Sequence, residues 1–207
     1  MSNRDIEYKY KSAEPTHNAN YLIEPVIDLL ARTNISDKRI FELGCGNGSI
    51  TNQFSKLGYK LTAVDTSQSG IELAKHAYPN CQFEVGSAYD DLADRFGRFD
   101  CVISFEVVEH VFSPKKYAET LFDLTNSGGV AIVSTPYHGY LKNLCLALFN
   151  KFDSHFNPLW EGGHIKFWSK NTLSVLLKDS GFKEIQFINV GRTPLLAKSM
   201  IAIASKP

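Results

Sequence analysis

Three glycines at alternating positions, Gly44, Gly46 and Gly48, follow a short apolar run and precede a helical pattern that begins at Ser49. Glycine lacks the Cβ atom that keeps a backbone away from a ligand, and the first N–H groups of a helix are free to bind one. Asp65 ends the next apolar run, about 20 residues further on, where an acidic residue holds the ribose hydroxyls in nucleotide-binding βαβ units. These residues predict a nucleoside site that lies directly on main chain.

The spacing of the glycines limits which nucleotide this site accepts. Dinucleotide-binding folds use G-x-G-x-x-G, whereas this chain has G-x-G-x-G, preceded by the acidic Glu42. No Lys-Ser or Lys-Thr pair follows the glycines, which excludes a phosphate-binding P-loop. A nicotinamide-dependent oxidoreductase is therefore the disfavoured alternative.

A second group of polar residues follows the apolar run that ends at Phe105. Glu106, Glu109 and His110 are spaced at i, i+3 and i+4, which on a helical turn places two carboxylates and one imidazole on one face. Two hard oxygens and one imidazole suit a divalent cation such as magnesium, manganese or zinc. The alternative is a structural cluster in which His110 only ties the loop together. The sequence leaves both interpretations open.

Histidines supply the candidates for a general base. His138, His155 and His164 are weighed for this role, because an imidazole with an ordinary pKa of about 6.5 accepts a proton at neutral pH. His164, which lies just before the helix-start signal at Ser169, is the first choice and His138 the second. Tyr137 is the candidate hydrogen-bond partner of the substrate.

Strand and helix patterns alternate from residue 39 onward, as is typical of α/β proteins. The expected strands are 39–43, 60–65, 82–86, 99–105, 130–134, 185–190 and 200–204, and the expected helices are 49–57, 67–76, 114–125 and one from about 169. Near-continuous apolar strands with short βα links predict a parallel sheet covered on both faces, and such sheets bind ligands at the carboxyl ends of their strands. Ser87 and Ala88, which follow the third strand, are therefore expected beside the adenine.

The motif Phe-Glu-Leu-Gly-Cys-Gly-Asn-Gly at residues 41–48 resembles the first motif of the class I methyltransferases that use S-adenosylmethionine, and the resemblance extends over nearly the whole chain. It implies a Rossmann-like doubly wound seven-stranded sheet in the order 3-2-1-4-5-7-6, with the last strand antiparallel and helices on both faces. It also implies that the methionine end of the cofactor meets Gly44 and the main chain of Phe105. The expected cofactor-binding residues are Glu42, Gly44, Gly46, Gly48, Asp65, Thr66, Ser87, Ala88 and Phe105.

The element E-x-x-E-H at Glu106, Glu109 and His110 resembles that of the O-methyltransferases of ubiquinone biosynthesis, in which these positions are taken to hold a divalent cation. The resemblance implies methyl transfer to a small O-acceptor such as a phenol or quinol, with S-adenosylhomocysteine as product. A phenol has a pKa of about 10, so a base or a metal must help it to ionise. N- or S-methylation of another metabolite, and a related protein that binds the cofactor without catalysis, remain as alternatives.

The chain of 207 residues is expected to form a single methyltransferase domain, residues 1–207, with an N-terminal cap at about 1–34 and a lid or insertion at about 136–168. By resemblance, Tyr10, His17 and Tyr21 are candidate lid residues over the cofactor, while the alternative is a surface helix with a frayed arm. The insertion is expected either to form a hydrophobic wall for the substrate or to dock on the core.

Composition restricts the partners. Lys and Arg total 22 and Asp and Glu total 22, so there is no global field to attract nucleic acid, although an RNA or peptide acceptor stays open. Four cysteines without C-x-x-C spacing favour reduced thiols and a cytoplasmic location. No signal peptide or membrane span is expected, and peripheral membrane contact stays open. The sequence does not indicate an oligomeric state.

Overall fold

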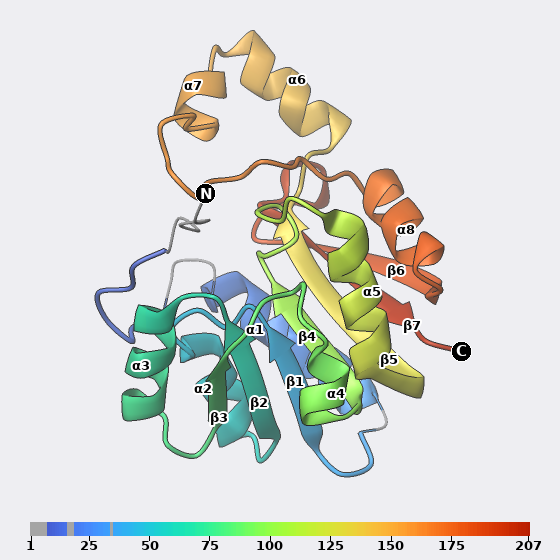
Figure 1. Cartoon of the computed structure of the whole chain (residues 1–207). Coiled ribbons are helices and arrows are strands. Elements are labelled where there is room, and N and C mark those ends of the chain that lie inside the picture. Colours follow the sequence, from blue (N-terminus) through green and yellow to red (C-terminus); the bar gives the residue numbers. More distant parts are fainter. Residues whose placement is uncertain (1–7, 16–18, 34) are drawn as a thin grey trace.

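A computed structural model describes residues 8–15, 19–33 and 35–207, and Figure 1 shows their arrangement. His17, one of the candidate lid residues, lies outside the described residues. Among the described residues, no helix has the length and apolar composition needed to cross a membrane.

A mixed sheet forms the centre of the fold (Figure 1). Its strands are β1 (Arg39–Leu43), β2 (Lys60–Asp65), β3 (Gln82–Val85), β4 (Phe99–Phe105), β5 (Thr125–Pro136), β6 (Lys183–Val190) and β7 (Ser199–Ser205). They are ordered β3-β2-β1-β4-β5-β7-β6, and β7 runs antiparallel to both β5 and β6. The predicted strand order and antiparallel last strand are confirmed.

Helices cover both faces of this sheet, which explains why the strands are apolar on both sides. The helices of the first face are α1 (Ala19–Arg32), α2 (Ser49–Lys56) and α3 (Gln68–Ala77), and those of the second are α4 (Leu92–Phe96), α5 (Pro114–Leu124) and α8 (Lys170–Asp179). Alternate residues of β4 serve the two cores: Ile103 packs in the cluster that contains Phe54 of α2, and Val102 packs with Leu121 of α5.

The structure differs from the sequence-based expectations at three places. Strand β5 begins at Thr125, before the expected position 130, and its pairing with β4 is irregular between Phe99 and Cys101. The short helix α4 was not expected. Residues 106–110 form a turn and not a helical segment, and Glu106 has a φ of 55°, which is in the left-handed region.

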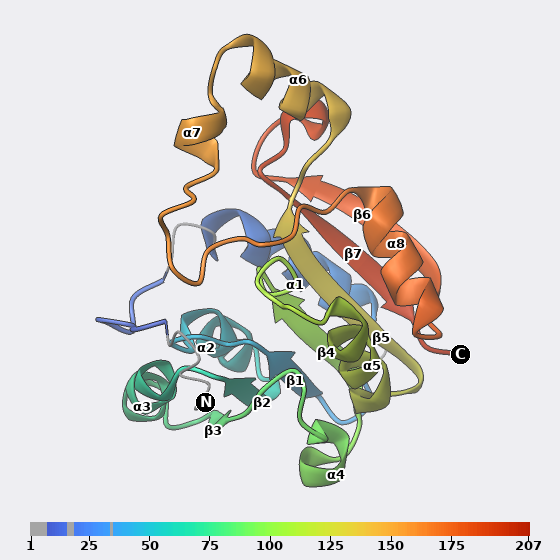
Figure 2. The same ribbon diagram turned by 45° about the horizontal axis from the view of Figure 1, so that its top comes forward.

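The insertion between β5 and α8 stands beyond the carboxyl ends of the strands, as Figures 1 and 2 show. It contains α6 (Tyr140–Leu148) and the one-turn α7 (Phe152–His155). None of the α6 residues is fully buried, and the helix contacts the 3-10 turn η1 (Pro194–Leu196) of the β6–β7 connection. The insertion therefore borders the edge of the sheet where a ligand is expected.

Candidate functional site

The glycine loop follows β1 and passes close to other protein atoms. Gly44 and Gly46 have φ values of 85° and 56°, a conformation that side chains rarely adopt. A Cβ atom at Gly44 would collide with Val107, and one at Gly46 would collide with Tyr10. The loop therefore requires glycine both for its backbone conformation and for space.

Asp65 is tied to this loop at the end of β2. Its carboxylate accepts hydrogen bonds from the main-chain N–H of Gly46 at 2.7 Å and of Ser67 at 2.8 Å. Burial raises the pKa of Asp65, and these main-chain donors act in the opposite direction by stabilising the carboxylate. A carboxylate has about four lone-pair directions, so Asp65 retains capacity to accept a hydrogen bond from a ligand hydroxyl group as well as from the main chain.

Glu42 lies beneath the loop rather than on its open side. Its side chain is 1% exposed and accepts a hydrogen bond from Thr51 Oγ1 at 2.5 Å. Burial raises the pKa of Glu42 to about 7. The arrangement joins β1 to α2 and so supports the loop that both elements flank.

An N-terminal segment, residues 8–14, lies across the glycine loop. The Asn47 side-chain amide donates to the carbonyl oxygens of Ser12 and Glu14, both at 2.9 Å. Tyr78 Oη donates to the carbonyl of Ala13, and Tyr10 is close to Gly46. The segment is thus attached to the loop from two sides, where a cap over a nucleoside would lie.

The remaining expected cofactor residues line the same edge of the sheet. Thr66 is exposed directly after Asp65, and Ser87 follows β3, where its Oγ accepts from the main-chain N–H of Tyr89 at 3.2 Å. Ala88 packs against the core of the second face. The Phe105 side chain points away from the site, toward Phe54, so only its main chain is placed at the carboxyl end of β4.

A cavity of about 310 Å³ lies at the carboxyl ends of β4 and β5, beside the turn that packs on the glycine loop. Its lining residues come from α1, the ends of β4 and β5, the insertion and the β6–β7 connection: Tyr21, Glu106, Pro136, His138, Lys142, His155, Phe156, His164, Arg192, Lys198 and Ser199. Glu106 connects the two regions, because the next residue, Val107, packs against Gly44. A methyl donor whose reactive end lies at Gly44 would therefore face this cavity.

Glu106 is the acidic residue of the cavity wall. Its carboxylate accepts hydrogen bonds from Ser134 Oγ at 2.8 Å and from Ser199 Oγ at 3.3 Å. Burial raises the pKa of Glu106 to about 7, and the two serine hydrogen bonds limit that rise. Glu106 is thus poised to take up or release a proton near neutral pH.

The candidate bases His138 and His164 both line the cavity, but their surroundings favour the neutral ring. Desolvation lowers the pKa of each to about 4, with Lys142 as a further cause at His138 and His110 at His164. His155, which also lines the cavity, has a lowered pKa for the same first reason. All three act at neutral pH as uncharged hydrogen-bonding groups and weak bases.

Tyr137 does not line the cavity. It packs against the core of the second face, and its main-chain N–H donates to the Lys198 carbonyl at 3.0 Å. Its predicted contact with the substrate therefore has no support in this geometry. Tyr21, by contrast, lines the cavity and forms a hydrogen bond with Ser199 at 3.3 Å.

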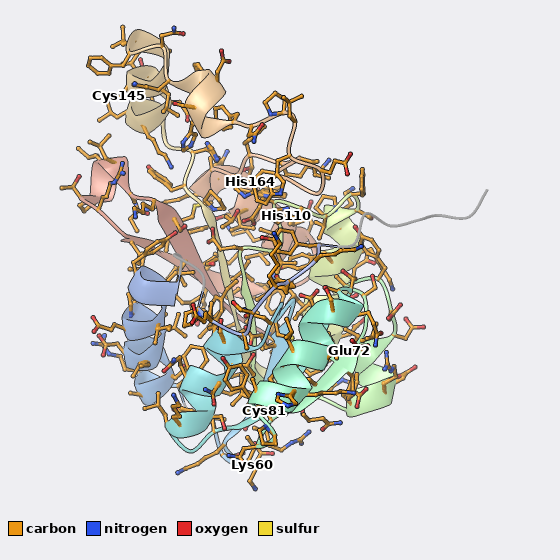
Figure 3. All side chains as sticks on the ribbon, turned by 90° about the vertical axis from the view of Figure 1, so that its left-hand side faces the viewer. Lys60, Glu72, Cys81, His110, Cys145 and His164 are labelled. Carbon is orange, nitrogen blue, oxygen red and sulfur yellow. The ribbon has the colours of Figure 1, made fainter. Side chains whose placement is uncertain are left out.

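The structure groups Glu109, His110 and His164 as possible metal ligands, with one ligand atom of each within 4.8 Å of the others. Figure 3 shows that the two histidines of this group lie near each other. Glu109 Oε1 is buried and has no hydrogen-bond partner among the described residues, while Oε2 accepts from Thr135 Oγ1 at 3.0 Å. His110 Nδ1 lies 2.8 Å from the carbonyl oxygen of Gly162, which assigns the proton to Nδ1 and leaves Nε2 free to bind a cation.

This donor set fits a divalent cation, because one oxygen and two imidazole nitrogens suit zinc or another first-row metal. It differs from the predicted set, since His164 joins Glu109 and His110 where Glu106 was expected. The reason is the turn at 106–110: Glu106 faces the serines of β5 and β7, while Glu109 and His110 meet the loop that precedes α8. That loop is held there by the N–H groups of Ile165 and Lys166, which donate to the Glu109 carbonyl at 2.9 and 3.0 Å.

Comparison with known families decides the classification of the chain. A family model described as a methyltransferase domain matches residues 16–186. The chain belongs to this family. The strand order, with β7 antiparallel, agrees with a class I methyltransferase of the kind that uses S-adenosylmethionine, as the glycine motif indicated.

Individual relatives share between about a quarter and two fifths of their aligned residues with this chain. The ubiquinone biosynthesis O-methyltransferase of Caulobacter sp. (strain K31) is 37% identical over 120 residues, 56% of this chain and 47% of that protein. Its namesake in Aromatoleum aromaticum is 25% identical over 186 residues, 88% of this chain and 79% of that protein. The chain spans about half the length of the Caulobacter relatives.

Solved structures support the fold of the methyltransferase domain. A S-adenosylmethionine-dependent methyltransferase from Methanosarcina mazei superimposes with a TM-score of 0.65 and 20% identity. The match covers 86% of this chain and 96% of that chain.

Sequence reasoning missed four polar residues that line the methyltransferase cavity: Lys142, Arg192, Lys198 and Ser199. Lys142 comes from the insertion, and the other three come from the β6–β7 connection and the start of β7, 50 or more residues later in the sequence. The predicted hairpin of the last two strands could have indicated the residues of its turn. Because β7 is antiparallel to β5, that turn lies at the carboxyl end of β5, next to the cavity.

Proposed function

We propose that this chain transfers the methyl group of S-adenosylmethionine to a hydroxyl oxygen of a small aromatic acceptor, such as a phenol or quinol. The observation that carries the proposal is Glu106, a carboxylate with a pKa of about 7 in the wall of a cavity at the carboxyl ends of β4 and β5. The names of the relatives from Caulobacter and Aromatoleum support an oxygen acceptor.

The cofactor is proposed to lie along the carboxyl ends of β1, β2 and β4. Asp65 accepts from the ribose hydroxyls, Thr66, Ser87 and Ala88 border the adenosine, and the glycine loop underlies the amino-acid end. Glu42 supports the loop from below. The methyl group then points past Gly44 toward the cavity, and the protein contributes mainly by holding the acceptor oxygen in line with the carbon–sulfur bond and excluding water.

The transfer forms an oxygen–carbon bond and breaks the carbon–sulfur bond, and the acceptor loses its hydroxyl proton. A phenol with a pKa of about 10 needs a base for this step at neutral pH. Glu106 is proposed to accept that proton, because its pKa of about 7 leaves much of it ionised. His164 and His138 are the other candidates, and their lowered pKa values make them weaker bases than Glu106.

A divalent cation is a further part of this proposal. Glu109, His110 and His164 would hold it, and the bound cation would lower the pKa of a coordinated acceptor hydroxyl. Elemental analysis of protein purified without chelator, beside Glu109→Gln, tests the site. Stoichiometric metal in the wild type that is lost in the variant supports it, and equal, negligible metal in both removes it.

Methyl transfer itself is tested with labelled S-adenosylmethionine and the probe catechol, with mass spectrometry of the product. We expect a mono-methyl ether and equimolar S-adenosylhomocysteine. Parallel reactions with aniline and thiophenol distinguish nitrogen and sulfur acceptors. Calorimetric binding of S-adenosylhomocysteine without any methylated product would instead identify a cofactor-binding protein that lacks catalysis.

A further inference from the structure

Three cationic side chains surround the cavity, and they come from two separate segments. Lys142 lies in the first turns of α6, while Arg192 and Lys198 lie in the connection between β6 and β7. In the part of the chain that the structure describes, none of the three forms a salt bridge with a carboxylate. Glu106 is the carboxylate that lines this cavity, and it is engaged by Ser134 and Ser199.

Lys142 is held in place among these charges. Its Nζ donates to the main-chain carbonyl of Lys198 at 3.4 Å, so the ammonium group is attached to the β6–β7 connection. Burial and, to a smaller extent, the nearby Arg192 guanidinium lower the pKa of Lys142 to about 8, while Glu106 opposes this shift. A half-buried ammonium beside a second cation is costly unless an anion offsets the charge.

The histidines that line the cavity do not add to its positive charge. His138, His155 and His164 all have lowered pKa values and are uncharged at neutral pH. They provide hydrogen bonds without adding charge. The cavity therefore carries an excess of positive charge on the side of α6 and the β6–β7 connection, and a single carboxylate, Glu106, on the side of the glycine loop.

We infer that the acceptor carries an anionic group, a carboxylate or a phosphate, which binds between Lys142 and Arg192 while the acceptor hydroxyl lies near Glu106. This inference rests on the proposed function, because it names the class of acceptor for the same site. The planar guanidinium of Arg192 suits either anion, and Lys142 adds a point charge. A cavity of about 310 Å³ accommodates a molecule with one aromatic ring.

The test compares two catechols that differ at one ring position, 3,4-dihydroxybenzoate with a carboxylate and 4-methylcatechol with a neutral methyl group. Each is titrated by calorimetry into protein saturated with S-adenosylhomocysteine, so that binding is measured without turnover. We expect the acid to bind at least 10-fold more tightly than the neutral probe. Lys142→Met and Arg192→Met should each remove most of that difference and leave the binding of 4-methylcatechol unchanged.

Lys151→Met is the matched control, because Lys151 is an exposed lysine of the same insertion that does not line the cavity. Arg192 is exposed, so its substitution is compatible with folding even if Lys142→Met is not.

Competition by benzoate and by phenyl phosphate shows which anion the cations prefer. Equal binding of the acid and the neutral probe, or no binding of either, overturns the inference, as does an equal loss of both probes in the variants.

Methyl-transfer assays with the same two probes separate the inference from the function on which it rests. Tight binding of the acid that depends on Lys142 and Arg192, without a methylated product, contradicts the proposed transferase activity and supports the anion site. Methylation of both probes with equal KM values supports the activity and contradicts the anion site.

Discussion

The carboxylate of Asp65 and the main-chain N–H of Gly46 are joined by a hydrogen bond of 2.7 Å. This bond fixes the end of β2 against the loop that follows β1, before any ligand is bound. A nucleoside that binds here therefore meets an acceptor whose orientation is already set, which reduces the ordering that binding requires.

Asp65→Asn tests this arrangement, because the new amide keeps the size of the side chain and removes its charge. We expect the affinity for S-adenosylhomocysteine to fall by about 10- to 100-fold, which corresponds to the ~1.5–3 kcal/mol of hydrogen bonds to a charged group. Calorimetry measures the change. Asp94→Asn, at an exposed position of α4, is the control, and a wild-type affinity in Asp65→Asn would contradict the ribose contact.

Asn47→Ala tests whether residues 8–14 act as a cap. The substitution removes both hydrogen bonds from the Asn47 amide to Ser12 and Glu14. We expect the dissociation rate of S-adenosylhomocysteine to rise by about 10-fold, since each bond contributes roughly 0.5–1.5 kcal/mol. Stopped-flow displacement provides the rate, with Asn52→Ala on α2 for comparison. Unchanged kinetics would assign the segment a structural role alone.

Glu106→Gln tests the proposed base through the pH profile. Because burial raises the pKa of Glu106 to about 7, its basic form increases as the pH rises through that value. The wild-type kcat/KM should therefore rise with pH up to about 7 and then level off. In Glu106→Gln this rise should disappear and the rate should drop by about 100-fold. A rise that persists in this variant and disappears in His164→Ala would transfer the role to His164.

Glu42→Gln tests how much the burial of the Glu42 carboxylate destabilises the folded protein as the pH rises. The pKa of Glu42 is raised from 4.5 to about 7, so the folded state binds a proton more tightly than the unfolded state does. The stability contributed by that proton is complete below about pH 4.5 and is lost as the pH rises to about 7.

The variant lacks this titration, so its free energy of unfolding relative to wild type should rise by up to about 3 kcal/mol between pH 4.5 and pH 8. Urea denaturation at a series of pH values gives the difference curve, in which the titration of other buried carboxyl groups cancels. A flat difference curve would mean that Glu42 stays ionised in the folded protein.

The sheet could be predicted because its signals are local. Runs such as residues 39–43 and 99–105 are mostly apolar, and the structure places strands β1 and β4 at those same residues. The glycine motif and Asp65 were also recognisable, since their separation of about 20 residues follows from the length of one βα unit.

The acidic turn could not be predicted in the same way. Glu106 adopts a left-handed conformation, and its carboxylate accepts hydrogen bonds from Ser134 and Ser199, which are 28 and 93 residues later in the chain. Likewise, His164 joins Glu109 only because main-chain hydrogen bonds hold residues 165 and 166 against the turn. Periodicity within a short window carries no information about such contacts.

The connection between β6 and β7 lies at one edge of the sheet, whereas the glycine loop follows the inner strand β1, yet Arg192 and Lys198 reach the cavity from that connection. Changes in residues 191–198 can thus alter which molecules are accepted without touching the strands that carry the donor. Selectivity and donor chemistry are therefore free to evolve independently, and grafting this hairpin between relatives is a direct route to altered acceptor choice.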